Sequence, residues 1–226
     1  MTGVALLTVS SLAAGLVMAL GVRPVLLRLP EPVGAVDKTS YRDLATGPFV
    51  AVCALVAMAA QALAAVALPP SLLPLWSVLA TAGVLLAAID ARTTWLPLPL
   101  TRAAWVMGVL AVVTALVLGA PVSAAVRGLV GAVVAGGLYL AVWAVTRGGF
   151  GFGDVRFAPL LGAATASQSW TLLIWGLTLG TTVGALHGAS RLLRRRSGGF
   201  PYAPSMLVGS YLAVLALHLL LGPPGG

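Results

Sequence analysis

The sequence predicts an all-α, polytopic integral membrane protein with about eight transmembrane segments. Its 226 residues are 60% hydrophobic and only 8% charged, whereas a soluble domain carries about 25% charged residues. The apolar residues form long runs of the length that a membrane-spanning helix needs, and short loops separate the runs. We therefore expect residues 1–226 to form a single membrane domain.

The apolar runs follow one another along the chain. They cover about residues 4–27, 49–68, 75–89, 101–118, 122–146, 155–166, 170–189 and 201–221. A loop is expected at 91–100, where Pro97 and Pro99 prevent a helix from continuing. The sixth run is too short to cross a bilayer core of about 30 Å as a straight helix. We therefore expect a short or partly re-entrant helix over 155–169.

Basic residues predict the orientation of the segments, because Lys and Arg concentrate in cytoplasmic loops. If the N-terminus is extracytoplasmic, the cytoplasmic connections and their flanks hold all 13 Lys and Arg residues except Arg127. The sequence thus predicts an extracytoplasmic N-terminus. It also places Asp90 and Asp154 on the same, cytoplasmic, face.

The net charge of +8 does not indicate a nucleic-acid-binding protein. The basic residues fall in short loops and do not alternate with aromatic residues, so we expect no nucleic-acid partner. The expected surroundings are a lipid bilayer, and nothing in the sequence indicates an oligomeric state. Cys53 is the single cysteine and lies within an apolar run. We therefore expect no disulfide, no metal and no other cofactor.

Two of the five acidic residues, Asp90 and Asp154, lie where an apolar run meets a short loop. A carboxylate at the edge of hydrocarbon is energetically costly, so such residues are candidates for function. The other three acids, Glu31, Asp37 and Asp43, belong to one polar loop. They are most simply solvated.

The aspartate at position 154 follows glycines at 148, 149, 151 and 153. Glycine leaves room for an approaching peptide and permits unusual backbone angles. Two carboxylates held close together share one proton, and such a pair can activate water for peptide hydrolysis. The residues alone leave a second interpretation open, in which Asp90 and Asp154 are interfacial residues paired with Arg92 and Arg156.

Three patches of the sequence share a pattern with a known family. The first is Asp90, then five residues, then Leu96-Pro97; the second is Gly151-Phe152-Gly153-Asp154, followed by Val155-Arg156; the third is Pro201-Tyr202-Ala203-Pro204 before the last apolar run. Together they resemble the type IV prepilin peptidases, polytopic aspartic peptidases with a GxGD motif. The resemblance covers about residues 75–221.

The resemblance implies an aspartic endopeptidase of the inner (plasma) membrane. It implies that type IV prepilin-like precursors are the substrates and that their leader is removed at the cytoplasmic face. Asp90 and Asp154 would form the catalytic dyad. Residues expected to shape the site or to bind substrate are Gly151, Gly153, Pro97, Arg156, Pro201 and Pro204.

The polar loop at 28–48 departs from the larger members of that family. They carry a cytoplasmic domain there, with paired cysteines, that supports N-methylation of the trimmed pilin. This chain has about twenty residues in the loop and no cysteine in it. We therefore expect a short form that is a peptidase without zinc and without N-methyltransferase activity.

Two other functions remain open at this point. A small proton-coupled transporter would use the two aspartates as a relay, although both lie at one face and such sites usually lie near the midplane. The other is a non-catalytic membrane subunit of a pilus or secretion assembly. Such a subunit has no evident need for two carboxylates whose placement beside hydrocarbon is energetically costly.

Overall fold

The computed structural model describes residues 2–31, 39–147, 149, 151–195 and 200–222, and within them it contains helices and no strands. The predicted all-helical fold is confirmed. Asp37, Lys38, Gly148 and Arg196 lie outside the described residues. The long helices are α1 (Thr2–Arg28), α2 (Gly47–Ala67), α5 (Leu98–Val117), α6 (Val122–Val145), α8 (Trp170–Leu193) and α9 (Ala203–Leu221).

The third segment is one continuous helical rod over Pro70–Thr93. It consists of η2 (Pro70–Leu72), α3 (Leu73–Val78), a π-helical stretch η3 (Leu79–Gly83) and α4 (Val84–Thr93). In its most apolar part 78% of the residues are buried, against 17–44% in the six long helices. The rod therefore forms the interior of the helical bundle.

Seven helices in the described part of the chain are long and apolar enough to cross a membrane. This confirms the prediction of a polytopic membrane protein. The remaining apolar segment is α7 (Phe152–Gln168), a single helix of 17 residues. At 1.5 Å per residue α7 is about 26 Å long. The short sixth segment of the prediction is thus a continuous helix.

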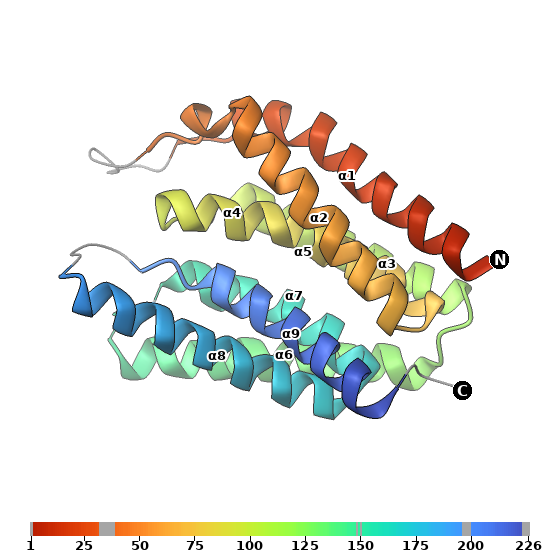
Figure 1. Ribbon diagram of the computed structural model, residues 1–226. Helices are drawn as coiled ribbons and strands as arrows, with labels where there is room; N and C mark the ends of the chain where they lie inside the picture. The colour runs from red at the N-terminus through yellow and green to blue at the C-terminus, as the bar shows by residue number, and fades with distance from the viewer. Residues whose placement is uncertain (1, 32–38, 148, 150, 196–199, 223–226) are drawn as a thin grey trace.

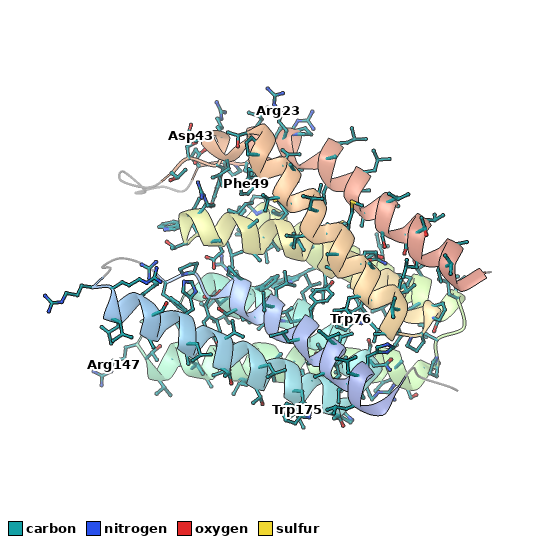
Figure 2. The ribbon with its side chains drawn as sticks, viewed as in Figure 1. Arg23, Asp43, Phe49, Trp76, Arg147 and Trp175 are labelled. Carbon is teal, nitrogen blue, oxygen red and sulfur yellow. The ribbon has the colours of Figure 1, made fainter. Side chains whose placement is uncertain are left out.

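Successive segments alternate in direction, so the connections fall at two ends of the bundle (Figure 1). The segments that join α1 to α2, α4 to α5, α6 to α7 and α8 to α9 gather at one end, and both termini lie at the other. Figure 2 shows Asp43 and Arg147 at the first of these ends and Trp175 toward the second. The connections at the first end are the ones that the charge count assigns to the cytoplasm. That assignment remains a prediction.

Helices pack together through small residues and present large apolar residues outward. A Cβ added to Gly131 of α6 would overlap α7, and a Cβ on Gly162 of α7 would overlap the carbonyl of Gly131. Membrane helices associate through such small residues because their backbones can approach closely. Val117 and Val145 are strongly exposed, as a lipid-facing surface requires.

The loop after Asp90 is shorter than the sequence suggested. α4 continues to Thr93 and α5 begins at Leu98, so the boundaries expected at 91 and 100 were wrong. Thr94 ends α4 in the left-handed conformation (φ 58°), and its amide donates to the carbonyl of Asp90 at 2.7 Å. Pro97 caps α5 and Pro99 lies in its first turn, where a missing N–H removes no helical hydrogen bond.

Candidate active site

Asp90 lies in the last turn of α4, and only 4% of its surface is exposed. Its Oδ2 atom accepts a hydrogen bond from the backbone amide of Ala203 at 3.1 Å. Ala203 is the first residue of α9. The first amides of a helix have no partner within the helix and carry partial positive charge, so they stabilise a nearby carboxylate.

The turn that follows Asp90 is fixed by its own hydrogen bonds. The hydroxyl of Thr93 donates to the carbonyl of Ile89 at 2.9 Å and accepts from the amide of Trp95 at 3.2 Å. Pro97 is buried, and its carbonyl accepts from both the amide and the hydroxyl of Thr101 at 3.0 and 3.1 Å. Pro97 therefore contributes to the site by holding this turn.

Asp154 lies in the first turn of α7, and 5% of its surface is exposed. Its amide donates to the carbonyl of Gly151 at 3.1 Å, which forms the turn that begins the helix. Its Oδ1 atom is buried and has no hydrogen-bond partner among the described residues. Such buried oxygens are uncommon, and this one leaves Asp154 with an acceptor for a further donor.

The two aspartates come together at the amide of Ala203. Asp154 interacts electrostatically with Asp90 and also with this amide. The carboxylates reach one point from α4 and α7, although α5 and α6 lie between them in the chain. Two buried carboxylates that interact do not both ionise readily, and such a pair can share one proton.

Gly151 and Gly153 provide space at the site. Gly151 has ordinary backbone angles (φ −64°, ψ 125°), so it contributes space and not an unusual conformation. A Cβ on Gly151 would lie 2.8 Å from Oδ2 of Asp154, and a Cβ on Gly153 would lie 3.0 Å from the Cβ and Cδ1 atoms of Leu96. The first glycine accommodates the carboxylate. The second lets α7 pack against the turn that follows Asp90.

Arg156 belongs to an aromatic cluster at the start of α7. Its guanidinium lies over the ring of Phe152, 4.6 Å from the centroid. Phe152 packs edge-to-face on Trp143 of α6 with centroids 5.1 Å apart. The indole N–H of Trp105 donates to the carbonyl of Arg156 at 3.0 Å. These contacts fix α7 against α5 and α6 in the turn that contains Asp154.

Pro201 and Pro204 flank Ala203 on both sides. Pro201 is buried, and Pro204 lies in the first turn of α9. Because proline restricts φ to about −65°, the two residues reduce the number of backbone conformations that the chain can adopt where α9 begins. They therefore help to place the Ala203 amide.

The burial of the aspartates argues against the interpretation that they are interfacial residues paired with arginines. Both side chains are almost fully buried, whereas Arg92 is exposed. The guanidinium of Arg156 lies against an aromatic ring. Solvated pairs at helix ends would expose the carboxylates, so the geometry favours a buried carboxylate pair.

Tyr41 lies near the aspartates without any sequence signal that identifies it. It belongs to the segment between α1 and α2, and it is 2% exposed. Burial, Glu31 and Asp90 raise the pKa of Tyr41 to about 12, so its hydroxyl stays protonated. Glu31 holds this segment in place by accepting from the hydroxyl of Ser40 at 2.6 Å and from the amide of Tyr41 at 3.2 Å.

Two further tyrosines contact the site region from α6 and from the start of α9. Tyr139 is buried and interacts electrostatically with Asp154. Tyr202 immediately precedes Ala203, and its ring lies 6.0 Å from that of Tyr139. Tyrosines in or beside apolar segments are typical core or interfacial residues, so the sequence alone does not identify these two.

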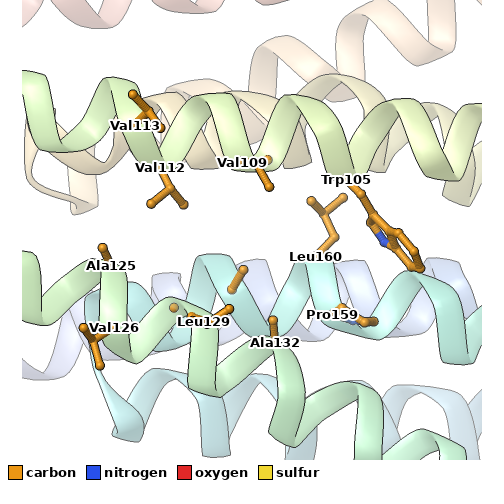
Figure 3. A pocket seen from close by; sticks show the side chains of 13 residues that line it. Trp105, Val109, Val112, Val113, Ala125, Val126, Leu129, Ala132, Pro159 and Leu160 are labelled. Atoms are coloured by element: carbon orange, nitrogen blue, oxygen red, sulfur yellow. The ribbon is translucent and has the colours of Figure 1, made fainter.

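An apolar groove lies between α5, α6 and α7 and contains neither aspartate. It has a volume of about 520 Å³, and Trp105 and Val113 lie toward its opposite ends (Figure 3). Its lining includes the small residues Gly108, Gly128 and Ala132. Through Trp105, which donates to the carbonyl of Arg156, the groove borders the beginning of α7.

Within the part of the chain that the structure describes, no three His, Cys, Asp or Glu side chains lie close enough to hold a metal ion.

Fold and site together define a class of polytopic helical membrane proteins in which two aspartates from separate helices meet at one end of the bundle. Comparison with known proteins identifies the family. The type IV leader peptidase family matches residues 77–219, and the chain belongs to this family. The matched residues include Asp90, Asp154 and Ala203.

A curated relative is the prepilin leader peptidase/N-methyltransferase of Bacillus subtilis (strain 168). It is 35% identical over 99 residues, which cover 42% of this chain and 38% of that protein. The chain thus matches well under half of the relative's own length. No solved structure matches the chain.

Proposed function

We propose that this protein is a membrane aspartic endopeptidase that removes the leader from type IV prepilin-like precursors. Asp90 and Asp154 form its catalytic dyad. The observation that carries the proposal is the meeting of two buried carboxylates at one backbone amide, that of Ala203. Membership of the type IV leader peptidase family supports the reaction class.

The dyad acts through the single proton that its two carboxyl groups share. The ionised carboxylate removes a proton from a water molecule, whose oxygen attacks the scissile carbonyl carbon. The protonated carboxyl donates its proton to the carbonyl oxygen as the tetrahedral intermediate forms. Collapse of that intermediate returns one of its hydroxyl protons to the ionised carboxylate and breaks the C–N bond. The amine leaves with the proton of the other carboxyl, so the dyad again holds a single proton. The Ala203 amide stabilises the negative charge of the pair.

The proposed substrates are precursors with a leader followed by an apolar helix. The Bacillus subtilis relative is named a prepilin leader peptidase/N-methyltransferase, and the first part of that name supports this assignment. The dyad lies at the end of the bundle where four connections gather. A leader at the cytoplasmic face of the plasma membrane would reach this end without crossing the bilayer.

The proposal is limited to peptide cleavage. The relative's name also includes N-methyltransferase, but the loop at 28–48 is short and has no cysteine. We assign the methyl transfer to the larger family members and not to this chain.

A cleavage assay tests the proposal directly. The protein is co-expressed with an epitope-tagged prepilin, and loss of the leader is followed on a gel. Wild type should trim the precursor, and Asp90→Asn and Asp154→Asn should each reduce the rate at least about 100-fold. Asp43→Asn is the matched control, because Asp43 is an exposed acid at the same end of the bundle.

The outcomes distinguish the proposed functions. Normal trimming by either Asp90→Asn or Asp154→Asn would show that the dyad assignment is wrong. Failure of wild type to trim a panel of pilin-like precursors would contradict the peptidase function and favour a transporter or a non-catalytic assembly subunit.

A further inference from the structure

Tyr202 lies at the position where α9 begins, directly before the residue that contacts Asp90. It is the N-cap residue of α9, and the amide of Met206 donates to its carbonyl at 3.2 Å. The Ala203 amide can stay on Oδ2 of Asp90 only if the backbone at Tyr202 stays in place. The interactions that hold Tyr202 in place therefore also maintain the hydrogen bond from the Ala203 amide to Asp90.

The ring of Tyr202 fits against the backbone of α8. A Cβ added to Gly184 would overlap the ring, so only glycine at that position permits the contact. The ring also lies 5.9 Å from that of Phe200, which in turn packs at 5.0 Å on His187 of α8. Van der Waals contacts thus fix the plane of the ring.

The hydroxyl of Tyr202 belongs to a triangle of three hydroxyl groups. It donates to Oγ1 of Thr181 at 3.3 Å, and the side chain of Tyr139 interacts with this pair. Thr181 donates its own hydroxyl proton to the carbonyl of Leu177 at 2.8 Å. The Thr181 oxygen is therefore the acceptor for the proton of Tyr202.

The triangle lies next to both carboxylates. Tyr139 interacts electrostatically with Asp154, and Tyr202 adjoins Ala203, whose amide contacts Asp90. The proton of Tyr202 is directed at Thr181 and not at a carboxylate. This geometry gives Tyr202 a structural task near the dyad, which is to keep the start of α9 in position.

We propose that Tyr202 is a positioning residue whose hydroxyl, held by Tyr139 and Thr181, fixes the Ala203 amide on Asp90. The effect of Tyr202 on the rate of cleavage rests on the proposed peptidase function. Its effect on the position of the Ala203 amide does not rest on that function, so the two effects are measured separately.

Hydrogen–deuterium exchange of the purified protein in detergent tests the positioning without any substrate. Tyr202→Phe keeps the ring against Gly184 and removes only the hydroxyl, so exchange should rise about tenfold in a peptide that contains Ala203. Tyr139→Phe should have the same effect. Tyr211→Phe is the control, because its buried hydroxyl has no partner among the described residues and lies two turns further along α9.

Glycine variants test the contact of the ring in the same way. Gly184→Ala should displace the ring and raise exchange at Ala203. Gly188→Ala, one turn along α8, should not, since its added Cβ would meet only Phe200 at an ordinary 3.9 Å. Unchanged exchange at Ala203 in both Tyr202→Phe and Gly184→Ala would overturn the proposal, whatever the activity of the protein.

Cleavage kinetics of a prepilin then measure the catalytic consequence. For Tyr202→Phe we expect kcat to fall about tenfold, equivalent to about 1.4 kcal/mol, with KM unchanged, because the proposed role of the hydroxyl is to position the dyad and not to bind substrate. Faster exchange together with wild-type kcat would overturn the catalytic role. Faster exchange in a protein whose wild type cleaves no precursor would contradict the proposed function and leave the positioning of Ala203 supported.

Discussion

At the scale of single residues, the carboxylate of Asp154 lies directly against the backbone of Gly151. The space between them is smaller than a methyl group requires, because a Cβ at position 151 would lie 2.8 Å from Oδ2. Asp154 is held in a helical turn and its side chain is buried. A methyl group there can be accommodated only if the carboxylate moves.

Gly151→Ala should therefore lower the rate of prepilin cleavage by about tenfold or more without unfolding the protein. A shift of the carboxylate by less than 1 Å is enough to misplace a reacting group. The measurement is initial cleavage rate together with the melting temperature. Gly47→Ala serves as control, because Gly47 is the first residue of α2 at the same end and its Cβ would meet nothing within 4 Å. Equal rates for the two variants would contradict this account of Gly151.

Glu31 anchors the segment that carries Tyr41. Burial opposes ionisation of Glu31, but hydrogen bonds from Ser40 and from the backbone of Tyr41 and Arg42, together with the charge of Arg42, lower its pKa below 4.5. A group with a lowered folded-state pKa stabilises the fold above its unfolded pKa, and this stabilisation is lost as the pH falls through the folded pKa. At pH 8 the anchor is fully present.

Glu31→Gln should therefore speed tryptic cleavage after the exposed Arg42 at pH 8, by roughly 3–10-fold, the usual net effect of losing one hydrogen bond at an exposed site. Ser40→Ala removes the other partner of the 2.6 Å bond and should act in the same direction. Because the two changes remove the same interaction, the double variant should be cleaved no faster than Glu31→Gln. Additive effects would show that the two residues act independently.

The aspartates could be predicted from the sequence and the tyrosines could not. Asp90 and Asp154 are conspicuous because carboxylates are rare in this chain and expensive beside hydrocarbon. Tyrosines such as Tyr139 and Tyr202 occur in many apolar segments without a functional role. Their role here depends on the packing of α6, α8 and α9 against one another, which the sequence does not reveal. The Ala203 amide carries no side-chain signal at all, since every residue except proline has the same donor.

At the scale of secondary-structure elements, α6 and α7 form a close helix pair. Gly131 and Gly162 face each other across it, and a Cβ on Gly131 would lie 2.6 Å from the carbonyl oxygen of Gly162. This contact sets the distance between the helices and thus the position of α7, which begins with the residues around Asp154.

Gly131→Ala should lower the free energy of unfolding by about 1–3 kcal/mol, the usual effect of adding a methyl group to a packed interior. Gly137→Ala, on the same helix, should be neutral or slightly stabilising, because its Cβ would meet nothing within 4 Å and alanine favours helix. Thermal denaturation of the purified variants in detergent checks the difference. A melting temperature equal to wild type for Gly131→Ala would show that the two helices separate easily.

The sequence predicted the locations of the helices more accurately than it predicted the residues at which they end. Long apolar runs located every segment, including the short α7, because a bilayer demands about 20 apolar residues per crossing. The end of α4 was missed by three residues because Ala91, Arg92 and Thr93 read as a loop, while the chain needs Thr94 in the left-handed conformation before it can leave the helix. Such an ending depends on tertiary contacts of the turn, which the apolar pattern does not contain.

At the scale of the whole molecule, the alternating direction of the segments links the site to the orientation of the chain. The ends of α4 and α7 that hold Asp90 and Asp154 lie at the end of the bundle opposite to both termini. An extracytoplasmic N-terminus, as the charges predict, would therefore place the candidate site at the cytoplasmic face and the C-terminus outside. The opposite orientation would place the site outside, where a cytoplasmic leader could not reach it.

Single cysteines at the two ends test this orientation. In a Cys53→Ala background, Gly47→Cys and Ala91→Cys introduce exposed thiols at the end with the site, and Ser123→Cys introduces one at the other end. A membrane-impermeant maleimide should label positions 47 and 91 in inside-out vesicles only. It should label position 123 in spheroplasts only, because the bilayer separates the two ends. Labelling of positions 47 and 91 in spheroplasts would reverse the predicted orientation and with it the cytoplasmic site, and labelling of all three from one side would contradict the alternating arrangement of the helices.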